Sequence, residues 1–169
     1  MRRFGVWAAV PLLFVLACGS HSTMPKQGQA PDFELLDLQG RKVQLSGLKG
    51  HPLLVDFWAT WCGPCQMSIP LLQSFYERHK DEGLIVLGLN MDEDAELVPE
   101  FIKRFKMTYP VLLAGQSAVA SDFGVSGLPS FFFIDPNGAV VQSYEGFRED
   151  IADSWETTFQ SIKATSSHS

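Results

Sequence analysis

The chain has 169 residues, of which 46% are hydrophobic, a proportion ordinary for one globular domain with a substantial core. Its 19 acidic residues outnumber its 13 basic ones, so the formal net charge at pH 7 is −6. This negative charge argues against binding to nucleic acid and against electrostatic attraction to a membrane surface.

Residues 1–17 predict a secretory signal peptide. Two arginines precede an apolar run over residues 4–17, which is too short for a membrane span of about 20 residues. The run ends on Val15-Leu16-Ala17-Cys18, which resembles the lipobox of bacterial lipoproteins, where the cysteine becomes the lipidated N-terminus. We therefore expect lipidation at Cys18 and attachment to the membrane through the lipid, with ordinary secretion and a free Cys18 as the alternative.

Residues 18–30 predict a flexible tether, because they are rich in Ser, Gly, Gln and Pro and lack apolar periodicity. The folded domain is expected over residues 31–165. It opens with two alternating apolar stretches, 33–38 and 42–45, separated by Gln39-Gly40-Arg41, a pattern that predicts a β-hairpin.

The apolar run over residues 53–58 predicts a buried central strand. It leads into Trp61-Cys62-Gly63-Pro64-Cys65, after which apolar residues recur at the helical spacing of Ile69, Leu72, Phe75 and Tyr76. The two cysteines are therefore predicted to lie in the first turn of an amphipathic helix that ends near residues 81–83.

The remaining elements alternate between strands and helices, which indicates an α/β fold with parallel pairing in the sheet. Hydrophobic spacing and turn residues predict, in chain order, a strand at 84–90, a helix at 95–105, a strand at 109–113, a short helix at 117–123, antiparallel strands at 131–135 and 139–144, and a closing helix at 149–162.

The position of Cys62 predicts its chemistry. Unpaired backbone N–H groups and the helix dipole favour an anion at a helix N-terminus, so the thiol should ionise below the pKa of about 8.5 of a free cysteine. Cys62 is the candidate nucleophile, and Cys65, one turn further along, is the candidate resolving thiol. Since the third cysteine is Cys18, the sequence leaves no structural disulfide.

A zinc or copper site is the main rival interpretation of the cysteine pair. A structural zinc ion needs four ligands, and the chain has no second cysteine pair. The histidines are expected at the surface or in the chain ends; they are His21, His51, His79 and His168. We therefore predict a redox site and no metal.

The motif Trp61-Cys62-Gly63-Pro64-Cys65 resembles the active site of the thioredoxin superfamily, and residues 127–130, Gly-Leu-Pro-Ser, resemble its cis-proline loop. The opening hairpin and the extra helix and strand over residues 95–113 resemble the membrane-anchored TlpA and ResA branch. This resemblance implies a thioredoxin-like fold, in which helices flank a central mixed β-sheet carrying an N-terminal β-hairpin and a central αβ insertion.

The resemblance also implies roles for single residues. Asp56 falls where thioredoxins carry a buried aspartate that assists proton transfer at the second cysteine, and burial should raise its pKa. The ResA-like branch commonly has a glutamate three residues after the second cysteine, where this chain has Ser68, so Asp56 would act alone. Client contacts are expected from Trp61, Gly63, Pro64, Leu128 and Pro129, with a cis peptide bond before Pro129.

The function implied is that of an extracytoplasmic thiol-disulfide oxidoreductase that reduces protein disulfides, with no cofactor beyond the Cys62–Cys65 disulfide. Gly-Pro between the cysteines resembles the reducing members of the superfamily. Clients would be exported thiol proteins such as apocytochrome c, and a membrane protein of the DsbD or CcdA type would supply electrons. The location implied is the bacterial cell envelope, on the periplasmic or external side.

Two alternatives keep the fold but change the chemistry. A peroxiredoxin-like thiol peroxidase would have Pro-x-x-x-Thr-x-x-Cys, but Thr60 stands two residues before Cys62 and no such proline precedes it. A copper chaperone would have Cys-x-x-x-Cys and a distant histidine. The spacing of Cys62 and Cys65 favours the dithiol reductase over both.

Overall fold

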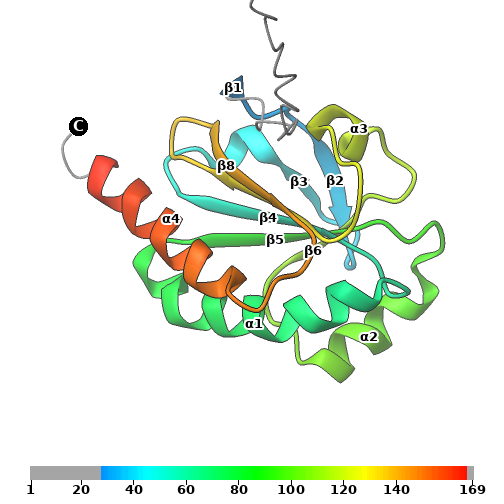
Figure 1. The fold of residues 1–169 in the computed structure, drawn as a ribbon. Coiled ribbons are helices and arrows are strands. Elements are labelled where there is room, and N and C mark those ends of the chain that lie inside the picture. Colours follow the sequence, from blue (N-terminus) through cyan, green and yellow to red (C-terminus); the bar gives the residue numbers. More distant parts are fainter. Residues whose placement is uncertain (1–27, 167–169) are drawn as a thin grey trace, which may run out of the picture.

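The computed structural model describes residues 28–166, and a single sheet of eight strands forms the centre of this part of the chain (Figure 1). The strands are β1 (Gly28–Gln29), β2 (Glu34–Asp37), β3 (Lys42–Gln44), β4 (Leu53–Trp58), β5 (Ile85–Asn90), β6 (Val111–Leu113), β7 (Ser130–Ile134) and β8 (Ala139–Glu145). Their order across the sheet is β1-β8-β7-β4-β5-β6-β2-β3, with β4, β5 and β6 parallel and the other pairs antiparallel. The predicted mixed sheet is confirmed.

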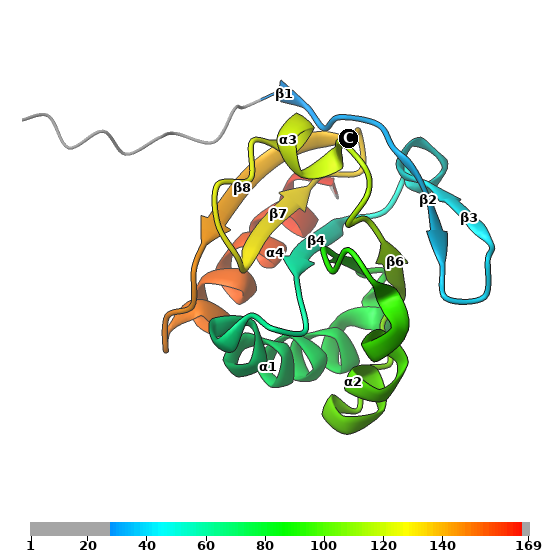
Figure 2. The ribbon, with the colours of Figure 1, turned by 90° about the vertical axis from the view of Figure 1, so that its right-hand side faces the viewer.

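Helices cover both faces of the sheet. The described helices are α1 (Gly63–His79), α2 (Val98–Phe105), α3 (Val119–Phe123) and α4 (Ile151–Ser166). The first, second and fourth pack on one face, and α3 lies on the other (Figures 1 and 2). Within residues 28–166, no helix is both long and apolar enough to cross a bilayer.

The central strand β4 is buried along its whole length, as its apolar sequence predicts. Successive side chains of a strand point to opposite faces. Leu54 and Trp58 accordingly join the core beneath α1, α2 and α4, whereas Val55 and Phe57 join the core beneath α3. Asp56 shares the face of Leu54 and Trp58, so this one polar residue of β4 points toward the active-site helix.

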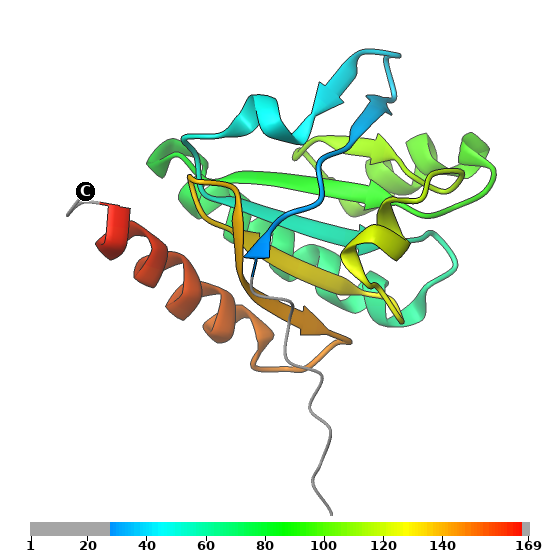
Figure 3. The same ribbon diagram turned by 90° about the horizontal axis from the view of Figure 1, so that it is seen from above.

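The predicted hairpin and the predicted insertion form one unit. Strand β2 pairs with β3 on one side and with β6 on the other, and β6 in turn pairs with β5. The β2–β3 hairpin therefore joins the sheet through the inserted strand β6, at the edge of the sheet that lies away from α4 (Figure 3). The helical part of the insertion begins as a 3-10 turn at Ala95–Leu97 and continues as α2.

The sheet begins earlier than the predicted domain boundary at residue 31. Gly28 and Gln29, assigned to the tether from their composition, pair with Val140 and Ala139 of β8. Both residues are exposed, and an edge strand held by backbone hydrogen bonds needs no apolar pattern. The predicted signal peptide, Cys18 and the rest of the tether lie outside the described residues.

Candidate active site

The active-site helix begins where the sequence predicts. Cys62 is the N-cap of α1, and its Sγ accepts a hydrogen bond of 3.2 Å from the backbone N–H of Cys65. Pro64 occupies the first turn, where its missing N–H leaves no hydrogen bond unmade. Pro70 lies inside the helix.

Cys62 and Cys65 form a disulfide with an Sγ–Sγ distance of 2.06 Å, so the structure represents the oxidised protein. The two sulfurs have different surroundings. Both cysteines belong to the core cluster beneath α1, but Cys62 is 5% exposed and lines an open groove, whereas Cys65 is fully buried and does not line it. A thiol that attacks another protein must be reachable from outside, and this asymmetry supports Cys62 as the nucleophile.

The groove beside Cys62 has a volume of about 620 Å³. The active-site loop contributes Trp61, Gly63 and Pro64, and the chain before β7 contributes Leu128. Trp61 is 70% exposed, as expected of a surface that meets a partner protein. The tertiary structure therefore brings these four predicted contact residues together around the nucleophilic sulfur.

The Leu128–Pro129 peptide bond is cis, which confirms the prediction. Pro129 itself is not among the residues that line the groove, although its neighbour Leu128 is. Three apolar lining residues were not anticipated from the sequence: Met91, Ala120 and Val125. Met91 directly follows β5, Ala120 lies in α3 and Val125 follows α3. Nothing in the sequence around them distinguishes them from ordinary core residues.

Asp56 is fully buried, and neither of its carboxyl oxygens has a hydrogen-bond partner in the described part of the chain. Burial raises the pKa of this carboxyl well above its usual range, as the sequence analysis expected. The cluster of buried side chains on the same face of the sheet includes Cys65. A carboxyl with a raised pKa on the face of the sheet that packs against the active-site helix is suited to exchange protons at neutral pH.

Ser68 is also fully buried, at the position of the glutamate found in the ResA-like branch. Its hydroxyl donates to the backbone carbonyl of Cys65 at 3.1 Å. A serine hydroxyl held in this way does not titrate near neutral pH. Ser68 therefore does not supply the titratable group that the glutamate of the ResA-like branch would supply.

Asp92 holds the loop that carries Trp61 and Cys62. Its carboxylate accepts hydrogen bonds from the Thr60 N–H at 2.9 Å and the Thr60 hydroxyl at 2.6 Å, and from the side-chain amide of Asn90 at 2.6 Å. The sequence analysis missed this contact, because 32 residues separate Thr60 from Asp92. The active-site loop is thereby tied to the end of β5.

His79, expected on a solvated helix face, is only 5% exposed, so that prediction was wrong. Its ring lies between Phe75 and Phe159, and its two nitrogens lie 3.0 Å from Glu82 Oε1 and 2.8 Å from Glu156 Oε2. The reason is tertiary: α4 packs over the end of α1 and covers the histidine. Within residues 28–166, no group of three or more His, Cys, Asp and Glu residues is arranged to hold a metal ion.

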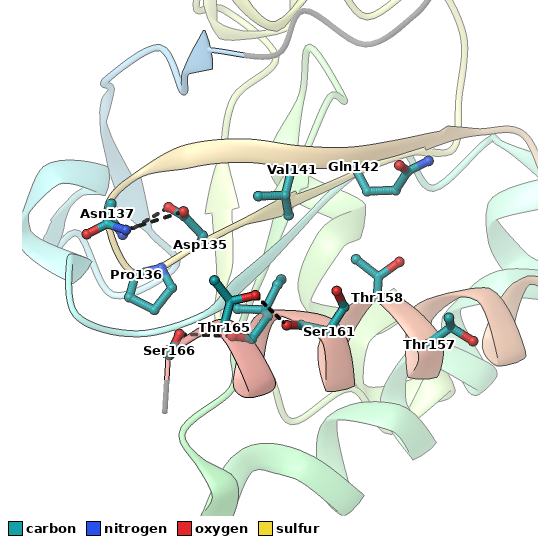
Figure 4. Close-up of a pocket in the computed structure, with 11 residues that line it drawn as sticks. Asp135, Pro136, Asn137, Val141, Gln142, Thr157, Thr158, Ser161, Thr165 and Ser166 are labelled. Atoms are coloured by element: carbon teal, nitrogen blue, oxygen red, sulfur yellow. Dashed lines mark hydrogen bonds between the residues drawn. The ribbon is translucent and has the colours of Figure 1, made fainter. Parts of the chain in front are cut away.

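A second hollow, of about 470 Å³, lies between α4 and the β7–β8 hairpin (Figure 4). It shares no lining residue with the groove at Cys62. Several hydroxyls of its helical wall bond to carbonyls of the preceding helical turn, for example Thr158 to Ser154 and Ser166 to Ile162. These hydroxyls are already satisfied, and the redox chemistry belongs to the other groove.

Comparison with known proteins agrees with this site. Residues 27–143 match the AhpC/TSA family. The thiol-disulfide oxidoreductase ResA of Geobacillus kaustophilus is 38% identical over 136 residues, covering 79% of this chain and 76% of the relative. ResA of Bacillus subtilis is 30% identical over 154 residues, covering 86% of each chain.

Solved structures show the same relationship. A thiol:disulfide interchange protein of the DsbE type from Chlorobium tepidum superposes with a TM-score of 0.77 at 31% identity, over 83% of this chain and 99% of that one. The thioredoxin domain of a thiol-disulfide oxidoreductase from Bacteroides vulgatus gives 0.71 at 27% identity, over 78% and 96%. The chain belongs to the AhpC/TSA family and, with its ResA relatives, to the thiol-disulfide oxidoreductases of thioredoxin-like fold.

Proposed function

We propose that this chain reduces disulfides of exported proteins, with Cys62 as the nucleophile and Cys65 as the resolving thiol. The observation that carries the proposal is the asymmetry of the dithiol at the start of α1. Cys62 lies at the helix N-terminus and borders the groove, whereas Cys65 is fully buried behind it. A client sulfur entering the groove meets Cys62 first.

The reaction begins from the reduced dithiol. The Cys62 thiolate attacks a client disulfide, an intermolecular disulfide forms, and the first client sulfur leaves as a thiolate. Cys65 then loses its proton and attacks Cys62 Sγ, which releases the second client sulfur and forms the Cys62–Cys65 disulfide. The dithiol loses two electrons and the client disulfide gains them.

Asp56 accepts the proton of Cys65 in the second step. Its raised pKa makes the ionised carboxylate a stronger base than an exposed aspartate. Its burial on the same face as Cys65 keeps the transfer away from bulk water. The shared burial of Asp56 and Cys65 on one face of the sheet supports these roles.

The groove residues Trp61, Gly63, Pro64 and Leu128 hold the client, and Pro129 shapes the loop that presents Leu128. The backbone of Leu128 offers hydrogen-bonding groups to an extended client segment, in the manner of strand addition. Recognition of this kind accepts different side chains, so several exported thiol proteins, apocytochrome c among them, can be clients.

The protein acts outside the cytoplasm as a lipoprotein anchored through Cys18. Support comes from the apolar run that ends on Ala17-Cys18 and from the tether that follows it. Reduction of the Cys62–Cys65 disulfide between cycles needs an external dithiol, which a membrane protein of the DsbD or CcdA type would supply. Cys18→Ala should stop cleavage by signal peptidase II and leave a larger precursor, and a soluble mature protein starting after Ser20 would contradict this anchor.

The test of the reductase is trapping in the cell envelope. Cys65→Ser leaves the nucleophile but removes the thiol that resolves the mixed disulfide, so clients should accumulate on Cys62 and be released by a reductant. The matched control, Cys62→Ser, should trap none of them. Equal capture by both variants would contradict the assigned roles, and rapid turnover of hydrogen peroxide by the wild type would favour the peroxidase alternative.

A further inference from the structure

Four polar side chains in the core beneath α1, α2 and α4 have buried atoms without hydrogen-bond partners in residues 28–166. They are the carboxyl of Asp56, the indole N–H groups of Trp58 and Trp155, and the hydroxyl of Tyr109. An unpartnered buried polar group is costly, so such groups call for an explanation. Their chemistry is complementary: an ionised carboxylate only accepts hydrogen bonds, an indole only donates, and a tyrosine hydroxyl can do both.

Gly88 brings the Tyr109 ring close to Asp56. On the sheet, Gly88 of β5 is the parallel partner of Asp56 of β4. A Cβ atom at Gly88 would lie 3.0 Å from Tyr109 Cε2 and 2.9 Å from Trp58 Nε1. The two rings therefore fill the space that a side chain would take beside Asp56.

Tyr109 is the better donor to the carboxylate of Asp56. Its side chain is 3% exposed, and its hydroxyl hydrogen can take either of two orientations in the ring plane, whereas an indole N–H has one fixed direction. Burial, and after it the negative charge of Asp56, raises the pKa of the Tyr109 hydroxyl. Tyr109 thus remains protonated and able to donate at neutral pH.

We propose that Tyr109 is a positioning residue for the redox reaction: its hydroxyl donates a hydrogen bond to the Asp56 carboxylate when that group ionises. The donation favours the ionised carboxylate and sets the pH at which Asp56 can take the proton of Cys65. This role rests on the reductase function proposed above and adds a residue that does not touch the client.

Within residues 28–166, burial is the cause of the raised pKa of Asp56, and no cation or second carboxylate contributes to it. At the positions paired with Asp56, β5 presents Gly88 and β7 presents Phe131. In the same cluster, α4 presents the indole of Trp155, and the described titratable groups in or against the cluster are the tyrosines, the two cysteines of the active site and His79, whose ring lies between Phe75 and Phe159.

The test is the pKa of Asp56 in Tyr109→Phe, measured by carbon-13 NMR of the aspartate carboxyls in the oxidised protein, where neither cysteine titrates. Phenylalanine keeps the ring and removes only the hydroxyl. A hydrogen bond to a charged group is strong enough that its loss should raise the Asp56 pKa by about one unit. The pH midpoint of the resolving step should rise with it.

Two other tyrosines provide matched controls. Tyr76→Phe alters a ring that packs edge-on against Tyr109, and Tyr144→Phe removes a hydroxyl bonded to Thr158 and Ser154. Neither should move the pKa of Asp56, even where Tyr144→Phe lowers stability. A shift of equal size in a control would assign the effect to general loosening and overturn the proposal.

The outcomes separate this inference from the proposed function. An Asp56 pKa in Tyr109→Phe equal to that of the wild type overturns the role of Tyr109, even if the dithiol reduces client disulfides normally. A raised pKa with no disulfide reductase activity in the wild type supports the contact with Asp56 and contradicts the reductase.

Discussion

The backbone N–H of Cys65 points at Cys62 Sγ and donates to it at 3.2 Å. The amide lies one turn inside α1, so the sulfur of Cys62 receives both a hydrogen bond and the positive end of the helix dipole. The same hydrogen bond would stabilise a thiolate after reduction, which links the local helix geometry to the reactivity of the nucleophile.

In the reduced protein, Cys62 should therefore have a pKa below the value of about 8.5 for a free thiol, and it should be alkylated before the buried Cys65. The pH dependence of the rate of alkylation by iodoacetamide gives the pKa of Cys62. Mapping the adduct by mass spectrometry shows which cysteine reacts first. Cys65→Ser should keep the low pKa. Preferential labelling of Cys65 would reverse the two roles.

Asp56→Asn should change how stability depends on pH in the oxidised protein. Because burial raises the folded-state pKa, the native protein keeps a proton that the unfolded chain releases above pH 4 or so. Wild-type stability then falls as pH rises from the unfolded pKa toward the folded one, at up to about 1.4 kcal/mol per pH unit. Asparagine cannot titrate and removes this slope.

Urea unfolding of both proteins at a series of pH values tests this effect. The stability of Asp56→Asn relative to wild type should increase with pH, and the exposed control Asp81→Asn should run parallel to the wild type. A pH-independent difference between Asp56→Asn and wild type would contradict the raised pKa. The variant should also resolve mixed disulfides more slowly, since an amide is no base.

Asp92→Ala should loosen the active-site loop. It removes the acceptor of the Thr60 N–H and hydroxyl and leaves the side-chain amide of the fully buried Asn90 without that partner. We expect a loss of about 1–3 kcal/mol in the free energy of unfolding and faster hydrogen exchange at the Thr60 amide. Asp94→Ala removes only an exposed cap at Glu96 and should change neither. Unchanged exchange at Thr60 would show that the loop is held by other contacts.

His79→Ala should separate stability from catalysis. The variant loses both hydrogen bonds to carboxylates and the packing of the imidazole between two aromatic rings. Its free energy of unfolding should therefore be about 2 kcal/mol lower than that of the wild type. His79 is the last residue of α1, and Cys62 is the N-cap at the other end of that helix. At a rise of 1.5 Å per residue, about 25 Å of helix separates the two residues. Disulfide reduction by the folded variant should match wild type, and so should the stability of the exposed control His51→Ala. A slower redox reaction in folded His79→Ala would contradict this separation.

Local sequence patterns predicted the elements well where apolar residues form a continuous run or recur at helical spacing. The cysteine motif, the buried strand before it and the periodic helix after it were all placed correctly, and the cis bond before Pro129 followed from the resemblance to thioredoxins. The short strand β1 was missed, because its pairing uses backbone groups and leaves both side chains exposed.

The sequence by itself determined the chemistry of this protein: a dithiol at a helix start, an aspartate in a buried strand, and the family to which they belong. Only the tertiary structure decided which distant residues complete the site. Met91 and Val125 reach the groove, Asp92 holds Thr60, and Tyr109 fills the space over Gly88. The physical reason is that hydrophobic periodicity indicates which face of a helix or strand is buried. Which distant side chains contact that face depends on how the sheet and the helices pack together.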